Sequence, residues 1–90
     1  MSSAVHLIAR GRVQGVWFRA GTQEQALQSG VCGWARNCPD GAGEIHAAGE
    51  KETLERFINW CRKGPPAAQV SDLDIEWVSP QGLITFEIHL

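Results

Sequence analysis

The sequence predicts an α+β fold in which two helices cover one face of a mainly antiparallel sheet. Strand-like and helix-like segments follow one another in the order β-α-β-β-α-β, with a short extra strand at the C-terminal end. One segment, residues 51–62, has strong helical spacing of its apolar residues. The chain has 90 residues, so we expect a single domain.

The first strand and the first helix are separated by a turn that contains glycine. Residues 5–9 place Val5, Leu7 and Ala9 in one phase, which is typical of a strand with one buried face. A helix is expected from about residue 19 to 29, because Gly30 follows as a terminator. Its apolar stripe is weak and consists of Thr22, Ala26 and Leu27.

A β-hairpin is expected to follow this helix. Residues 31–36 form its first strand and residues 44–48 its returning strand. Between them, Pro39 presets a turn dihedral, and Asp40-Gly41 is a dipeptide that closes hairpins.

The second half of the chain contains the clearest helix and two more strands. The helix places four apolar residues at i, i+3, i+4 and i+7: Leu54, Phe57, Ile58 and Cys61. Residues 64–66 (Gly-Pro-Pro) end this helix. Alternating apolar residues then predict two strands: Leu73, Ile75 and Trp77, followed by Ile84, Phe86, Ile88 and Leu90.

This order predicts a ferredoxin-like β-α-β-β-α-β sandwich with the two helices on one face. We expect its first and third strands to be central neighbours. That topology brings the turn after the first strand and the end of the second strand to the same edge of the sheet.

Composition excludes several functional classes. The net charge of −2 argues against nucleic-acid binding as the main activity. No apolar run is long enough to span a membrane, and no signal-peptide core precedes the first strand, so a cytoplasmic location is expected. Cys32, Cys38 and Cys61 lack paired metal spacing and are expected to be reduced, small apolar residues. A bridge such as Cys38–Cys61 is left open.

The turn at residues 11–19 is the strongest candidate for a binding site. Gly11 and Gly15 permit tight turning, and backbone amides leading into a helix N-terminus form a site for anions. Arg19 adds a permanently charged planar group. The segment lacks the Gly-Lys-Ser/Thr of a nucleotide-binding loop, which favours a small anion. An ordinary strand-turn-helix connection without a ligand is the alternative.

Several motifs in the chain resemble those of the acylphosphatase family. They are residues 13–19 (VQGVWFR), 33–37 (GWARN), 40–41 (DG) and 64–67 (GPPA). The resemblance covers residues 4–90, which it implies are one acylphosphatase-like domain, and it also implies the ferredoxin-like fold. It implies hydrolysis of the carboxyl–phosphate bond of small acyl phosphates, without a metal or other cofactor. Inorganic phosphate is then both product and inhibitor, and the protein is expected to be a monomer.

The resemblance also assigns the site residues. Arg19 matches the family's phosphate-binding arginine and Asn37 its catalytic asparagine. The turn that holds the phosphate is formed by Gln14, Gly15, Val16, Trp17, Phe18 and Arg19. Ala35 and Gly43 depart from the larger residues usual in the family and are expected to loosen packing near Asn37.

The proposed chemistry needs few groups. The leaving carboxylate has a conjugate-acid pKa near ~4, so it departs without a strong general acid. Turn amides and Arg19 would stabilise the charge of the phosphoryl oxygens. The Asn37 amide cannot take a proton at neutral pH, but it can orient a water molecule for in-line attack.

Three other interpretations are compatible with parts of the sequence. An anion-binding module without turnover would keep Arg19 but lack a competent Asn37. An RNA-binding module shares the element order but expects stacked aromatics and a basic surface, which the sequence lacks. His6, His46 and His89 share one sheet face and are expected to be solvated there and not to form a metal site.

Overall fold

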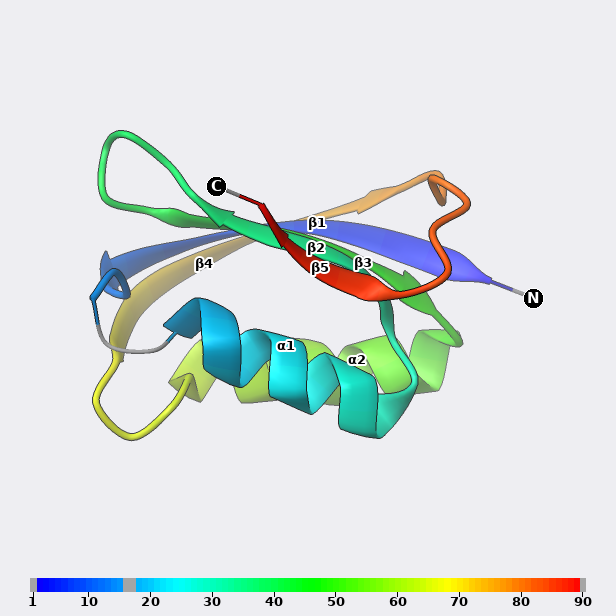
Figure 1. Cartoon of the computed structure of the whole chain (residues 1–90), viewed down its shortest axis with the longest axis horizontal. Helices are drawn as coiled ribbons and strands as arrows, with labels where there is room; N and C mark the ends of the chain where they lie inside the picture. The colour runs from blue at the N-terminus through cyan, green and yellow to red at the C-terminus, as the bar shows by residue number, and fades with distance from the viewer. Residues whose placement is uncertain (1, 16–17, 90) are drawn as a thin grey trace.

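Helices α1 and α2 pack on the same face of a five-stranded sheet, and no described helix covers the other face (Figure 1). The computed structural model describes residues 2–15 and 18–89, with only the backbone of Phe18. The elements are β1 (Ser3–Arg12), α1 (Phe18–Ser29), β2 (Cys32–Asn37), β3 (Gly43–Gly49), α2 (Lys51–Lys63), β4 (Gln69–Val78) and β5 (Phe86–His89).

The sheet has the strand order β4-β1-β3-β2-β5. All neighbouring strands are antiparallel except β2 and β5, which run parallel. The predicted ferredoxin-like sandwich is therefore confirmed, and β1 and β3 are central neighbours as expected. Ala9 of β1 and Asn37 of β2 both pair with Gly43 of β3, so the ends of β1 and β2 lie at one edge of the sheet.

The core lies between the sheet and the two helices. The helix-facing residues of β1, namely Val5, Leu7 and Ala9, are fully buried. All four apolar residues predicted for α2 are also buried: Leu54, Phe57, Ile58 and Cys61. Phe57 meets Phe86 of β5 edge to face, with 6.2 Å between ring centroids. This contact anchors the short last strand over α2.

Two expectations about burial are wrong. Leu27 is 57% exposed, because α1 turns only Thr22 and Ala26 of its expected stripe toward the sheet. Ile84 is 93% exposed, because β5 begins only at Phe86. Trp77 of the edge strand β4 is about half exposed.

All three cysteines have free thiols; Cys61 is buried, whereas Cys32 and Cys38 are partly exposed. Within residues 2–15 and 18–89, neither helix is long and apolar enough to cross a membrane.

Candidate active site

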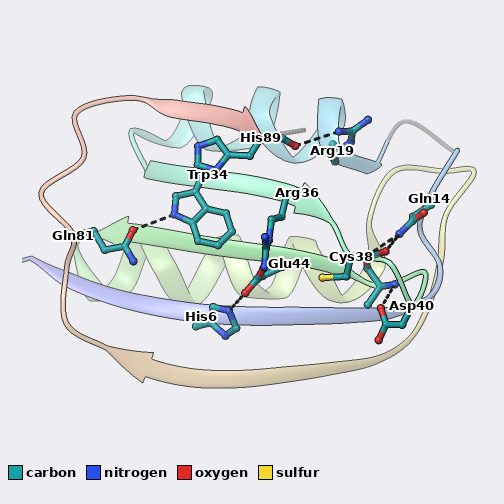
Figure 2. Close-up of polar contacts among 11 residues, drawn as sticks. His6, Gln14, Arg19, Trp34, Arg36, Cys38, Asp40, Glu44, Gln81 and His89 are labelled. Carbon is teal, nitrogen blue, oxygen red and sulfur yellow. Dashed lines mark hydrogen bonds and ion pairs between the residues drawn. The ribbon is translucent and has the colours of Figure 1, made fainter.

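Two loops that are distant in sequence meet at the edge where β1 and β2 end. The Gln14 side chain follows β1 and donates hydrogen bonds to the carbonyls of Cys38 (2.8 Å) and Ala42 (3.1 Å). Figure 2 shows the Gln14 amide pointing at the β2–β3 turn. One side chain thus ties the loop before α1 to the turn that follows Asn37.

The β2–β3 turn is held by its own hydrogen bonds. The Cys38 amide donates to the Ala42 carbonyl (2.8 Å), and the Gly41 amide donates to the Cys38 carbonyl (3.1 Å). The Asp40 carboxylate accepts from the Ala42 amide (3.0 Å). Gly41 has φ +97°, which favours glycine. This turn fixes the end of β2, where Asn37 stands.

The loop after β1 leads directly into the N-terminus of α1. Gly15 has φ +74°, and beyond its chain neighbours no described residue has a heavy atom within 4 Å of the position that a Cβ would take. Phe18 begins α1, and the first turn of this helix carries no acidic residue. The positive end of the helix dipole is therefore not neutralised by its own first turn. Val16 and Trp17 lie outside the described residues.

Arg19 and Asn37 line the same small pocket, between the start of α1 and the ends of β2 and β3. The residues around it are Val13, Arg19, Thr22, Ala35, Arg36, Asn37, Gly43, Glu44 and Ile45. The fold thus brings together two residues that are 18 positions apart in the sequence.

Ala35 and Gly43 form part of the wall of this pocket. A Cβ on Gly43 would lie 3.8 Å from Val13 Cγ2, an ordinary contact distance. Packing therefore leaves room for a side chain at position 43, and the effect of both small residues on turnover stays a prediction.

The two arginines of the pocket have different partners. Arg36 forms an ion pair with Glu44 and lies over the Trp34 ring, 5.9 Å from its centroid. Among the described residues, Arg19 donates one long hydrogen bond, 3.4 Å, to the His89 carbonyl, and no Asp or Glu side chain of that part of the chain pairs with it (Figure 2). Of these two guanidinium groups, Arg19 therefore keeps the charge that can bind an anion.

Glu44 balances the positive charge beside the pocket. Its carboxylate accepts a hydrogen bond from His6 Nε2 at 2.6 Å as well as the ion pair with Arg36. Burial raises the pKa of Glu44, but the hydrogen bonds from His6 and Arg36 outweigh burial and the pKa is lowered overall. Glu44 is therefore ionised at neutral pH and screens Arg36 from the pocket.

The three histidines differ in how far they are buried. His46 is 2% exposed, so the expectation that it is solvated is wrong. Trp34 lies between the rings of His46 and His89, with centroid distances of 6.1 and 5.3 Å, and covers His46 from solvent. Burial, together with the nearby His6, lowers the pKa of His46. Among the described residues, no group of three His, Cys, Asp or Glu could hold a metal ion.

Several residues of the pocket wall, among them Thr22 and Glu44, were not identified from the sequence. Thr22 was assigned to the apolar stripe of α1, and Glu44 only to the returning strand. A signal was available for Thr22, because residues three apart on a helix share a face, and Thr22 follows Arg19 by three. The partners of Glu44 depend on strand register, which the sequence pattern leaves open.

Comparisons with known proteins find relatives that match almost the whole chain. The sequence profile of the Acylphosphatase family matches residues 5–88. An acylphosphatase of Gloeobacter violaceus is 48% identical over 90 residues, which covers 98% of this chain and 97% of the relative. One of Nitrosococcus oceani is 46% identical and covered over its whole length. The crystal structure of acylphosphatase from Bacillus subtilis superposes over the whole of both chains with TM-score 0.95 and 34% identity.

Proposed function

The chain belongs to the acylphosphatase family, and we propose that the pocket lined by Arg19 and Asn37 is where it hydrolyses acyl phosphates. The activity itself, cleavage of the carboxyl–phosphate bond to a carboxylate and inorganic phosphate, is that of the family. The observation that carries the location is the convergence of Arg19 and Asn37 on one pocket beside a helix N-terminus.

Arg19 holds the phosphoryl group in this mechanism. Its guanidinium has no competing carboxylate among the described residues, and its long hydrogen bond to the His89 carbonyl is easily exchanged for a phosphoryl oxygen. The amides of residues 14–19, at the positive end of α1, add donors for the remaining oxygens. This set stabilises the charge that develops on the phosphoryl oxygens in the transition state.

Asn37 orients the attacking water. Its neutral amide oxygen accepts one hydrogen from the water, which directs a lone pair along the line of the P–O bond that breaks. The carboxylate leaves without general-acid help, because its conjugate acid is strong. The proton of the water passes to an oxygen of the substrate, and no residue of the pocket has to change its charge.

Four further features remain predictions that follow from the same proposal. The reaction needs no metal ion, and inorganic phosphate inhibits by occupying the Arg19 site. The protein acts as a monomer in the cytoplasm. The first three can be measured with purified protein, and the location can be measured by cell fractionation.

The proposal is tested by phosphate release from acetyl phosphate, measured with purified protein in excess EDTA. We expect hydrolysis at the same rate with and without the chelator. Arg19→Lys keeps the charge but loses the two-pronged geometry, so phosphate should inhibit this variant much more weakly. A wild-type protein that binds acetyl phosphate without hydrolysing it would be a binding module, and the proposal would be wrong. Activity that is lost with EDTA and restored by a divalent ion would refute the metal-free mechanism.

A further inference from the structure

Strand β4 is a long edge strand of the sheet. It spans ten residues, Gln69–Val78, and among the described strands it pairs with β1 alone (Figure 1). Pairing with β1 is regular from Asp72 to Val78, so this part of the edge keeps an unbroken alternation of side chains. Natural edge strands are often blunted by short length, lysine or proline, and β4 has none of these. Its outer backbone groups can therefore pair with one more strand.

One face of β4 carries a half-exposed apolar strip. Leu73, Ile75 and Trp77 alternate along the strand and pair with the buried, helix-facing residues of β1. Ile75 is 36% exposed and Trp77 46% exposed, so the described helices cover this strip incompletely. The Lys51 ammonium group of α2 lies 6.0 Å from the centroid of the Trp77 ring. Apolar side chains on an added strand would bury more of this strip.

The other face of β4 carries an exposed row of three carboxylates. Asp72, Asp74 and Glu76 alternate with the apolar strip, on the face that no described helix covers. Asp74 forms an ion pair with Arg10, whereas no described cation forms an ion pair with Asp72 or Glu76. Opposite charges that face each other across two strands stabilise the pairing. This row therefore favours lysine or arginine at the opposed positions of an added strand.

The same charges select the occupant of this edge. Directly opposed residues of antiparallel strands point to the same face of a sheet. Two copies of the chain that paired antiparallel through β4 would therefore place carboxylates opposite carboxylates, which is destabilising. Nucleic acids are repelled by the same row, since they are anionic. A basic strand of another protein has the complementary charge.

We propose that β4 docks an extended segment of another protein in which lysine or arginine alternates with large apolar residues. The segment lies along the outer side of β4 as an added strand of the sheet. Its cations face Asp72 and Glu76, and its apolar side chains cover Ile75 and Trp77. No residue of β4 lines the pocket of Arg19 and Asn37, so the docked segment leaves that pocket open.

Titration of the whole, isotopically labelled protein with a synthetic peptide tests this inference. The probe is a blocked peptide in which lysine and valine alternate, and its matched control has glutamate in place of lysine. We expect the lysine peptide to shift the amide NMR signals of residues 69–78 and to slow hydrogen exchange of the outer amides of β4. The glutamate peptide should do neither. Shifts confined to other elements, or no binding at about 1 mM peptide, would overturn the inference, because the carboxylates would then only protect the edge.

Reversing the charge of the row tests its selectivity. The double variant Asp72→Lys, Glu76→Lys should bind the lysine peptide about tenfold more weakly and should gain binding of the glutamate peptide. Glu24→Lys, Glu87→Lys is the matched control, because it changes the net charge equally at exposed positions of α1 and of β5, the opposite edge strand. The control should bind the lysine peptide within about twofold of the wild type, and circular dichroism verifies the fold of both variants.

Two results of these experiments would contradict the selectivity. Equal weakening in the two double variants would show that overall charge attracts the peptide and that β4 has no special role. A wild-type protein that dimerises through residues 69–78 in analytical ultracentrifugation and NMR would make a second copy the occupant. Either result would overturn the inference without bearing on the hydrolysis of acyl phosphates.

Discussion

Replacing Gln14 with alanine should both destabilise the fold and slow turnover. The Gln14 amide is the only described side chain that bonds both the Cys38 and the Ala42 carbonyls, at 2.8 and 3.1 Å. These carbonyls belong to the turn that holds Asn37 at the end of β2. Losing the amide frees this turn to move relative to the loop before α1, so water and phosphate are aligned less often.

The loss of stability can be calculated from the hydrogen bonds that the two carbonyls still accept in the variant. The Cys38 carbonyl still accepts from the Gly41 amide, and the Ala42 carbonyl still accepts from the Cys38 amide. Neither is left without a donor, so each lost bond costs about 0.5–1 kcal/mol, the lower part of the usual range. The total of about 1–2 kcal/mol corresponds to a decrease in Tm of roughly 5–12 °C for a domain of this size.

Thermal unfolding and acetyl phosphate kinetics, measured on the same preparation, test this reasoning. Gln23→Ala is the matched control, because Gln23 also donates one side-chain bond to a carbonyl, that of Phe86 at 3.0 Å, but does not touch the turn. We expect Gln23→Ala to lower Tm by about half as much and to leave kcat close to the wild-type value. A Gln14→Ala variant that unfolds at the wild-type temperature would refute the structural argument. One that loses stability but keeps its kcat would refute the link to Asn37.

Two further predictions concern stability. Gly33→Ala should lower the free energy of unfolding by more than about 3 kcal/mol, because Gly33 has φ +152° and a Cβ there would lie 1.8 Å from the His46 carbonyl oxygen. In urea unfolding, Gly43→Ala should be far milder. Equal losses in the two variants would contradict the strand register. The lowered pKa of Glu44 means that its carboxylate stabilises the fold above the ordinary value of 4.5 and that this contribution is lost as pH falls through the lowered pKa. The Tm of Glu44→Gln should therefore decrease less than the Tm of the wild type when the pH is lowered from about 6 to 3. Equal decreases would show that ionised Glu44 does not stabilise the fold.

Local sequence patterns predicted most of the secondary structure. The spacing of apolar residues in α2 identified all four of its buried side chains, because helical periodicity depends only on neighbours along the chain. The exposure of Leu27 and Ile84 was not predictable in this way. Burial at those positions depends on whether another element covers them, and among the described elements none covers either residue well.

The candidate site was predicted in part. Motif resemblance selected Arg19 and Asn37, and the strand topology explains why they share a pocket. The partners of the Gln14 side chain lie 24 and 28 positions away, on a turn whose register the sequence leaves open. Burial of His46 depends on a Trp34 side chain that crosses from the neighbouring strand. Such contacts arise from tertiary packing and have no local signature.

Kinetics of Asn37 variants test the central claim, that Arg19 holds phosphate while Asn37 holds water. We expect Asn37→Ala to lower kcat by ~10²–10³ and to leave the phosphate inhibition constant nearly unchanged. Asn37→Asp keeps the shape but places a negative charge beside the anion. At ~5 Å and an effective dielectric near 20, each pair of unit charges repels by roughly 3 kcal/mol, so phosphate inhibition should weaken strongly.

The most direct single measurement is therefore the phosphate inhibition constant of Asn37→Asp, determined beside its kcat and with circular dichroism to verify the fold. A folded variant with much weaker phosphate inhibition and low turnover is the predicted result. A folded variant with wild-type turnover and wild-type phosphate affinity would contradict the account, because Asn37 would then be a turn residue without a role in the reaction.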